Sequence, residues 1–333
     1  MGRDITLYPK ETTKHELIGF MKSLGFEKAN PINLKPGQTF LYWFEAKDYL
    51  SITGVEATLF SLKDDQDDSW AIHLRHTYSA SLYDVEMMNR VLREGKKKFG
   101  GYFEGDYGRN RYAPIWEEES TPISRGIERV YNQTKSRLDR VMFAIPQPIM
   151  KQATLENPKD PMAIWMASQD PIRHIYNALI PYAVSAFEFF FSRVFQVLLK
   201  YDDFALKRLM DHPRKVEFKD VLLLTKNEIS LESIVAESFS FQNLDSINKA
   251  YKDWFNIDVR KILYLKKRTG RKVSILNNRM EEIIKLRHGV IHHFVVDESI
   301  SRDDLLDVYK SIEVVIEVMT KALEDKYKFE IDR

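Results

Sequence analysis

The stretch YAVSAFEFFFSRVFQVLLK, residues 182–200, is apolar on almost every side when it is arranged as an α-helix. Large apolar side chains recur along one stripe at helical spacing: Val184, Phe187, Phe190, Val194 and Leu198. A helix that is hydrophobic nearly all round lies at the centre of a bundle, or is shared between its core and a subunit interface. The stretch therefore predicts a helical bundle built around it.

The longer apolar run that contains this stretch, residues 178–199, has the length of a membrane span. Glu188, Arg193 and Gln196 interrupt it, and Pro181 lies near its start, so we expect a helix buried within protein and no membrane segment. The first residues lack the apolar region of a secretion signal. Cysteine is absent, which excludes disulfides, thiolate catalysis and Cys-based zinc sites. We expect a cytoplasmic protein.

The sequence after residue 170 has few helix breakers. No proline follows Pro213. Apolar residues recur at helical spacing in five more segments: Phe218–Leu224, Leu231–Phe239, Leu244–Trp254, Lys272–Phe294 and Asp303–Leu323. We expect an all-α bundle over residues 170–326, followed by a short tail at 327–333.

The N-terminal part is rich in turns. Eleven of the thirteen glycines lie at or before Gly126. Strand composition marks Thr39–Phe44, Tyr49–Leu62 and Trp70–Tyr78, while helical spacing follows Thr13 and covers Tyr83–Lys98. These patterns predict an α+β domain over residues 1–145, joined to the bundle by a proline-rich linker at 146–169.

A glycine-rich segment, FGGYFEGDYGRNRY at residues 99–112, lies within this domain. It lacks the Lys-Ser/Thr of a phosphate-binding P-loop and the spacing of a dinucleotide fingerprint. We interpret it as a turn region with aromatic packing. The alternative is a ligand or RNA surface that uses Arg109 and Arg111.

The chain is almost neutral, with 50 Lys and Arg against 49 Asp and Glu and a formal charge of +1. Any binding of nucleic acid must therefore use local basic patches. One such patch lies just before the last-but-one helical segment and consists of Lys266, Lys267, Arg268, Arg271 and Lys272. It is a candidate for holding an RNA backbone. The alternative is a solvated loop.

The run RHGVIHH, residues 287–293, contains three of the eight histidines. Leu276, Met280, Ile283 and Ile284 form the apolar stripe of its helix, and the stripe continues to Arg287, which places the run on the buried face. A buried arginine needs an acid, a neighbouring subunit or a ligand phosphate, because an unpaired buried charge is costly. Arginine next to histidine can bind a phosphate and transfer a proton.

Two other interpretations of this run stay open. The first is a capped, salt-bridged helix end. The second is a metal site, because His288 and His292 stand at i and i+4. The zinc version of that spacing has Glu directly after the first His, where this chain has Gly289, and the sequence offers no evident third ligand. We expect no metal and no cofactor.

The run LRHGVIHH, late in an all-helical domain, resembles the HEPN superfamily (higher eukaryotes and prokaryotes nucleotide-binding). Members carry an Arg, often followed by a polar residue, and then a His after four to six intervening residues. Arg287, His288 and His292 match with four residues between Arg and His, and His293 fits with five. Three flanking segments are also similar to helices of the family: SAFEFFFSRVF (185–195), FQNLDSINKAYKDWFNID (241–258) and ISRDDLLDVYKSIEVVIEVM (300–319).

The resemblance implies a metal-independent endoribonuclease that acts as a homodimer, with two Arg–His motifs facing one cleft. Arg287 would bind the RNA phosphate and His292 would act as general acid or base, supported by His288, His293 and Glu188. Related ribonucleases often serve as toxins or antiphage effectors. Residues 1–145 would then sense a trigger, recruit RNA or restrain the nuclease, with a regulatory partner or ligand.

The chief alternative is a non-catalytic module. Some HEPN relatives lack nuclease activity, and Arg287 and His292 would then bind a nucleotide or RNA, or lie at a scaffold interface.

Overall fold

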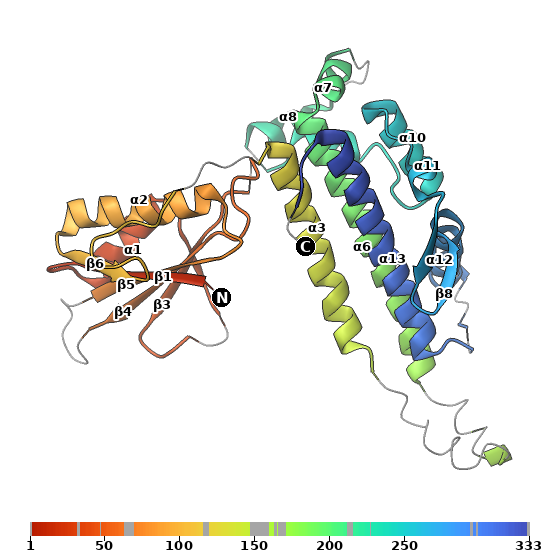
Figure 1. Cartoon of the computed structure of the whole chain (residues 1–333), viewed down its shortest axis with the longest axis horizontal. Coiled ribbons are helices and arrows are strands. Elements are labelled where there is room, and N and C mark those ends of the chain that lie inside the picture. The colour runs from red at the N-terminus through yellow and green to blue at the C-terminus, as the bar shows by residue number, and fades with distance from the viewer. Residues whose placement is uncertain are drawn as a thin grey trace. The chain divides into compact units, whose positions relative to one another are not determined.

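The computed structural model describes residues 2–31, 34–46, 48–62, 70–115, 120–146, 160–162, 165, 171–211, 216–226, 228–293, 296–297 and 299–331. They form two compact units, Met1–Arg125 and Gly126–Arg333 (Figure 1). The first unit is an α+β domain and the second is a helical bundle, as the sequence predicts.

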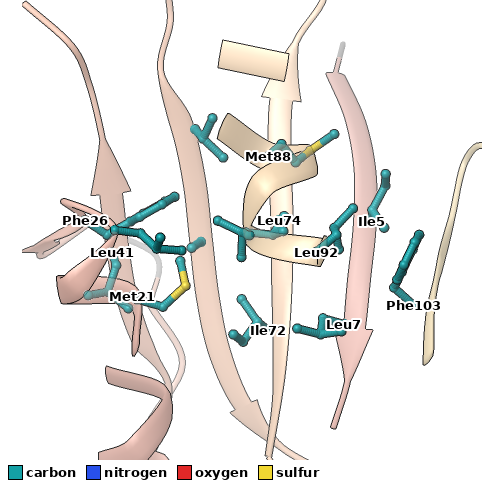
Figure 2. Close-up of a cluster of buried hydrophobic side chains, with 14 of the residues drawn as sticks. Ile5, Leu7, Met21, Phe26, Leu41, Ile72, Leu74, Met88, Leu92 and Phe103 are labelled. Carbon is teal, nitrogen blue, oxygen red and sulfur yellow. The ribbon is translucent and has the colours of Figure 1, made fainter. Parts of the chain in front are cut away.

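The N-terminal unit is a six-stranded antiparallel sheet in the order β2-β3-β4-β5-β1-β6. Its strands are β1 (Gly2–Tyr8), β2 (Glu27–Ala29), β3 (Thr39–Trp43), β4 (Val55–Ser61), β5 (Trp70–Thr77) and β6 (Tyr102–Gly105). Side chains of α1 (Lys14–Ser23) and α2 (Leu82–Phe99) pack with those of the strands in one apolar core (Figure 2). Both helices therefore cover the same face of the sheet.

Hydrogen bonds at the first turns explain where these two helices begin. The Thr13 hydroxyl accepts from the backbone N–H of Glu16, and the Glu16 side chain accepts from the backbone N–H of Thr13. Ser81 and Asp84 make the same reciprocal pair at the start of α2. Each pair satisfies backbone donors that the helix leaves without a partner.

The segment at residues 99–112 contains strand β6 and the turns that follow it, and its rings pack on neighbouring side chains, so the prediction of a turn region missed the strand. The Tyr102 ring on β6 stacks on Tyr8, with ring centroids 5.0 Å apart. The Arg109 guanidinium lies 4.2 Å from the centre of the Tyr102 ring. Arg109 thus has a structural contact, and Arg111 is exposed.

Four strands differ from the prediction. The sequence patterns did not indicate β1, β2 and β6, and β1 lies between β5 and the edge strand β6. The predicted strand Tyr49–Leu62 begins instead at Val55. Tyr49 and Gly54 both have positive φ, 54° and 71°, and that left-handed backbone cannot continue a strand.

In its described residues, the C-terminal unit consists of helices and one small hairpin. Its elements are α3 (Pro122–Ala144), α6 (Ile172–Tyr201), α7 (Asp203–Met210), α8 (Phe218–Thr225), α9 (Leu231–Ala236), α10 (Leu244–Phe255), α11 (Val259–Leu263), β7 (Lys266–Thr269), β8 (Lys272–Ile275), α12 (Leu276–His293) and α13 (Arg302–Tyr327). After α13 the chain folds back, and the N–H of Ile331 donates to Glu324.

Helix α6 lies at the centre of the bundle and contacts α7, α9, α10, α12 and α13 (Figure 1). Phe187, Phe190, Phe191 and Phe195 are fully buried, and burying each such side chain stabilises the fold by about 1.5–3 kcal/mol. The Tyr251 hydroxyl of α10 donates to the Phe191 carbonyl at 2.6 Å. By length and composition α6 could also cross a membrane, a property that buried core helices share.

Helix α3 corrects the predicted domain boundary. The N-terminal domain was expected to end at residue 145, after this helix. The chain instead divides into its two units between Arg125 and Gly126. A Cβ on Gly126 would lie 2.5 Å from Val197 of α6, and Lys135 forms an ion pair of 2.6 Å with Glu313 of α13. Most of α3 is therefore part of the bundle. The predicted linker at 146–169 lies largely outside the described residues.

We expect a fragment that begins at Ser120 to fold as a stable bundle, and a fragment that begins at Pro146 to be much less stable. The shorter fragment loses the buried side chains of Ile127, Val130, Tyr131 and Leu138. At about 1.5–3 kcal/mol each, this loss is comparable with the whole stability of an ordinary domain. Urea unfolding followed by circular dichroism measures the difference. Equal midpoints for the two fragments would contradict the placement of α3.

Candidate functional site

Arg287 lies where the apolar stripe of α12 leaves the core. Leu276, Met280 and Ile283 are buried against the bundle, and Arg287 follows on the same side of the helix. Its Nη2 atom is 3.6 Å from Oε1 of Glu188 on α6. The side chains are 15% and 21% exposed. The sequence left three partners open for Arg287, which were an acid, a neighbouring subunit and a ligand phosphate, and the structure places an acid of the same chain beside it.

The hydrogen bonding of this pair is incomplete. A separation of 3.6 Å is an electrostatic contact and too long for a hydrogen bond. Arg287 Nε and Glu188 Oε1 are both buried without a hydrogen-bond partner among the described residues. Leaving such groups unsatisfied costs stability, and sites that do so are candidates for ligand binding. An oxyanion beside Arg287 would give its guanidinium the missing acceptors.

Burial has a further effect on Glu188. Desolvation raises the pKa of its carboxyl group, and the positive charge of Arg287 opposes that rise only in part. The net pKa is above the usual value for a glutamate. The carboxylate therefore keeps its charge less firmly than an exposed glutamate does.

The histidines correct one prediction. The sequence placed the whole run on a buried face, but His288, His292 and His293 are all exposed. The apolar stripe ends early, because Ile284 is only half-buried and Ile291 is 38% exposed. The last turns of α12 therefore lie at the surface.

The three imidazoles form one cluster. The ring centroid of His288 lies 4.5 Å from that of His292 and 5.4 Å from that of His293. Within the described residues, no group of three His, Asp or Glu side chains has the arrangement of a metal site. The cluster places three imidazoles at one helix end beside an arginine.

A surface depression of about 450 Å³ connects these parts. It is lined by Gln242, Asn243, Ile284, Lys285, Arg287, His288, Gly289 and His293. His293 therefore lines the same depression as Arg287, whereas His292 does not. Gln242 and Asn243, just before α10, form part of the wall of this depression, and no sequence motif indicated them.

A polar line on α6 borders a second depression of about 350 Å³. Ser185, Glu188 and Ser192 line it, together with Phe189, Phe239, Ser240, Phe241 and Gln242. The two depressions share Gln242. Glu188 thus lies in the second depression while it contacts the arginine of the first.

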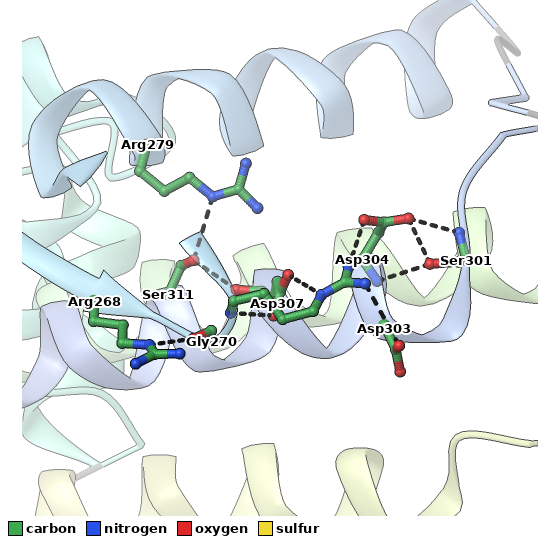
Figure 3. Close-up of polar contacts among 9 residues, drawn as sticks. Arg268, Gly270, Arg279, Ser301, Asp303, Asp304, Asp307 and Ser311 are labelled. Carbon is green, nitrogen blue, oxygen red and sulfur yellow. Dashed lines mark hydrogen bonds and ion pairs between the residues drawn. The ribbon is translucent and has the colours of Figure 1, made fainter. Parts of the chain in front are cut away.

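The basic patch forms the hairpin β7–β8, where a helix was expected from Lys272 onward. A two-residue turn joins the strands, and its Gly270 has a φ of 65°. Arg271 is bound by three acids of α13, at 2.9 Å from Asp307, 2.7 Å from Asp304 and 3.5 Å from Asp303. Figure 3 shows these three aspartates.

The charge of Arg271 is thus compensated within the chain, which leaves it little attraction for RNA. Arg268 donates to the Gly270 carbonyl (Figure 3). Lys266, Lys267 and Lys272 are exposed, and their binding of RNA stays a prediction. The contact was not predicted. The sequence feature that indicates it is the spacing of the three aspartates, which lie on one face of α13.

The C-terminal unit has the features of an HEPN domain. Its helix α12 carries Arg287, His288 and His292, and Arg287 lies beside an acid of the central helix α6. The family model described as RiboL-PSP-HEPN matches residues 152–325, more than half of the chain. The chain belongs to this family. HEPN domains are generally nucleases or related to RNA. The N-terminal part matches no family model. No curated protein and no solved structure matches the chain.

We expect Glu188→Gln to gain stability over the wild type as the pH rises. A carboxyl whose folded pKa is raised contributes stability below its unfolded pKa, and loses it as the pH rises through the folded value. Glutamine does not titrate and keeps its contribution. Urea unfolding between about pH 4 and pH 8 measures the trend.

Glu217→Gln removes an exposed carboxylate at the start of α8 and is the matched control. A stability difference for Glu188→Gln that stays constant with pH would show that Arg287 balances the effect of burial on the pKa of Glu188, and a difference that falls with pH would show that Arg287 outweighs it.

Proposed function

We propose that this protein is a metal-independent endoribonuclease whose active site is built on Arg287 and His292. Membership of the HEPN family supports a role on RNA. The observation that carries the proposal is the buried Nε of Arg287, which has no hydrogen-bond partner among the described residues and belongs to a side chain that lines a depression beside three imidazoles.

The reaction follows from these groups. Arg287 binds the scissile phosphate and stabilises the negative charge that develops on it. An imidazole takes the proton of the ribose 2′-hydroxyl, and the 2′-oxygen attacks phosphorus. The bond from phosphorus to the 5′-oxygen breaks, and that oxygen receives a proton from a second imidazole. The products carry a 2′,3′-cyclic phosphate and a 5′-hydroxyl, and DNA is inert because it lacks the nucleophile.

The choice of histidine rests on two different observations. His292 gives the motif spacing, with four residues after Arg287. His293 lines the depression of Arg287. We assign the main acid–base role to His292 and propose that His288 and His293 support it.

A homodimer would supply the second acid–base group of the reaction from the partner's motif. The exposed end of α12, with Ile291 38% exposed, is a surface that such a partner would cover. We further propose a cytoplasmic toxin or antiphage effector, in which the N-terminal unit senses a trigger or recruits RNA.

We expect the wild type to cleave RNA in excess EDTA, and Arg287→Ala and His292→Ala to lose at least about 100-fold of that rate. A mixed pool of tRNA and mRNA is the substrate, and the chemistry of the new ends is determined. Lys267→Ala, on the exposed hairpin, is the control for loss of one surface cation.

Loss in His293→Ala alone would transfer the acid–base role to that residue. RNA binding without cleavage by any variant would favour the non-catalytic module. Equal cleavage by all variants would remove Arg287 and His292 from the site.

We expect the fragment 120–333 to cleave RNA at a rate that differs at least about threefold from the full chain, because the N-terminal unit would restrain or feed the nuclease. The same RNA pool and equal protein concentrations make the two rates comparable. An identical rate and an identical set of cleavage sites would remove the regulatory and recruiting roles from residues 1–119.

A further inference from the structure

The depression that Glu188 lines continues away from Arg287 into a third depression of about 390 Å³. The second and third depressions share Phe189, Ser192, Phe239 and Phe241. The first and second share Gln242. Together they make a groove that begins at the candidate site and follows α6, with the segment between α9 and α10 as its opposite wall.

The lining of this groove beyond Glu188 is aromatic and mostly uncharged. Ser185, Ser192 and Gln196 recur along one face of α6. Phe239 and Phe241 form part of the opposite wall. Rings, hydroxyls and amides are the groups that hold a nucleobase, through stacking on its face and hydrogen bonds to its edge.

The charges of the groove disfavour a phosphate. Glu188 and Glu237 line its two parts. Arg193 also lines the third depression, but its guanidinium donates to Gln196 at 3.0 Å and lies 5.7 Å from the centre of the Phe189 ring. A ligand group that is neutral and flat fits this lining better than an anion.

Phe239 is the ring that is best placed for stacking. It is half-buried, and its position is fixed by ring contacts with Phe195 at 5.3 Å and Trp254 at 6.2 Å. Phe241 is buried and offers less surface. The Arg137 guanidinium already lies 3.8 Å from the centre of the Phe189 ring. A ring held by its neighbours and partly open to solvent loses little freedom when a base stacks on it.

We propose that this groove is a base-binding subsite, in which Phe239 stacks on an unpaired nucleobase next to the phosphate that Arg287 binds. The proposal rests on the nuclease function proposed above and extends it: the substrate is single-stranded RNA, because a base held in a duplex cannot enter the groove. In this proposal Arg287 binds the RNA backbone and the groove binds a base of the same strand.

The test is a binding measurement that does not depend on cleavage. Fluorescence anisotropy follows a labelled 2′-O-methyl RNA of about 12 nucleotides, which the nuclease cannot cut, bound to the full chain in EDTA. Phe239→Leu keeps an apolar side chain against Phe195 but removes the stacking surface. Ser192→Phe fills the groove from α6 and leaves Phe239 in place. Phe218→Leu, on α8 and 91% exposed, is the matched control.

We expect Phe239→Leu and Ser192→Phe each to weaken binding of the single strand by about tenfold, while Phe218→Leu binds like the wild type. A duplex of the same sequence should bind at least about tenfold more weakly than the single strand. Wild-type affinity in both groove variants, or equal affinity for strand and duplex, would overturn the subsite.

The two proposals fail separately. Binding that depends on Phe239, without any cleavage of natural RNA, would refute the nuclease and keep the subsite. Cleavage that depends on Arg287, with binding that ignores Phe239 and Ser192, would refute the subsite and keep the nuclease.

Discussion

The burial of the apolar face of α6 is the constraint on which the rest of the bundle depends. Its four central phenylalanines are inaccessible to solvent, so neighbouring helices must cover them from several directions. Helices α7, α9, α10, α12 and α13 contact it for this reason. Few positions on such a helix can hold a charged residue, because burying an unpaired charge is costly. Glu188 occupies one of them, at the seam where the cover by α12 ends.

At that seam the hydrogen bonding of a buried charged pair is incomplete, which costs stability. Arg287 and Glu188 are drawn out of water, yet they meet at 3.6 Å and leave a buried atom unsatisfied on each side. Well-packed apolar residues of similar size would often be at least as stable in such a place. An arrangement of this kind is expected where an outside group completes the hydrogen bonding. A second depression beside this pair has Phe189, Phe239 and Phe241 in its lining.

Arg271 shows the opposite use of an arginine. Three aspartates of α13 surround it, and its backbone N–H also donates to Asp307 at 3.1 Å. A Cβ on Gly270 would collide with Asp307, so the tight turn and the ion pairs depend on each other. This arginine fixes the hairpin against α13, whereas the Nε of Arg287 has no hydrogen-bond partner among the described residues. Arg271 and Arg287 thus differ in the partners that the fold brings to their side chains.

The sequence by itself determined the two fold classes, the central helix, the motif residues and the resemblance that the family match confirms, because apolar spacing and residue identity are local properties. It also predicted the acid partner of Arg287 as one of three possibilities. Only the tertiary structure decided that α3 belongs to the bundle, that the basic patch forms a hairpin held by aspartates, and that the histidines are exposed. These depend on where neighbouring helices end and which surfaces they cover, and spacing along one segment does not contain that information.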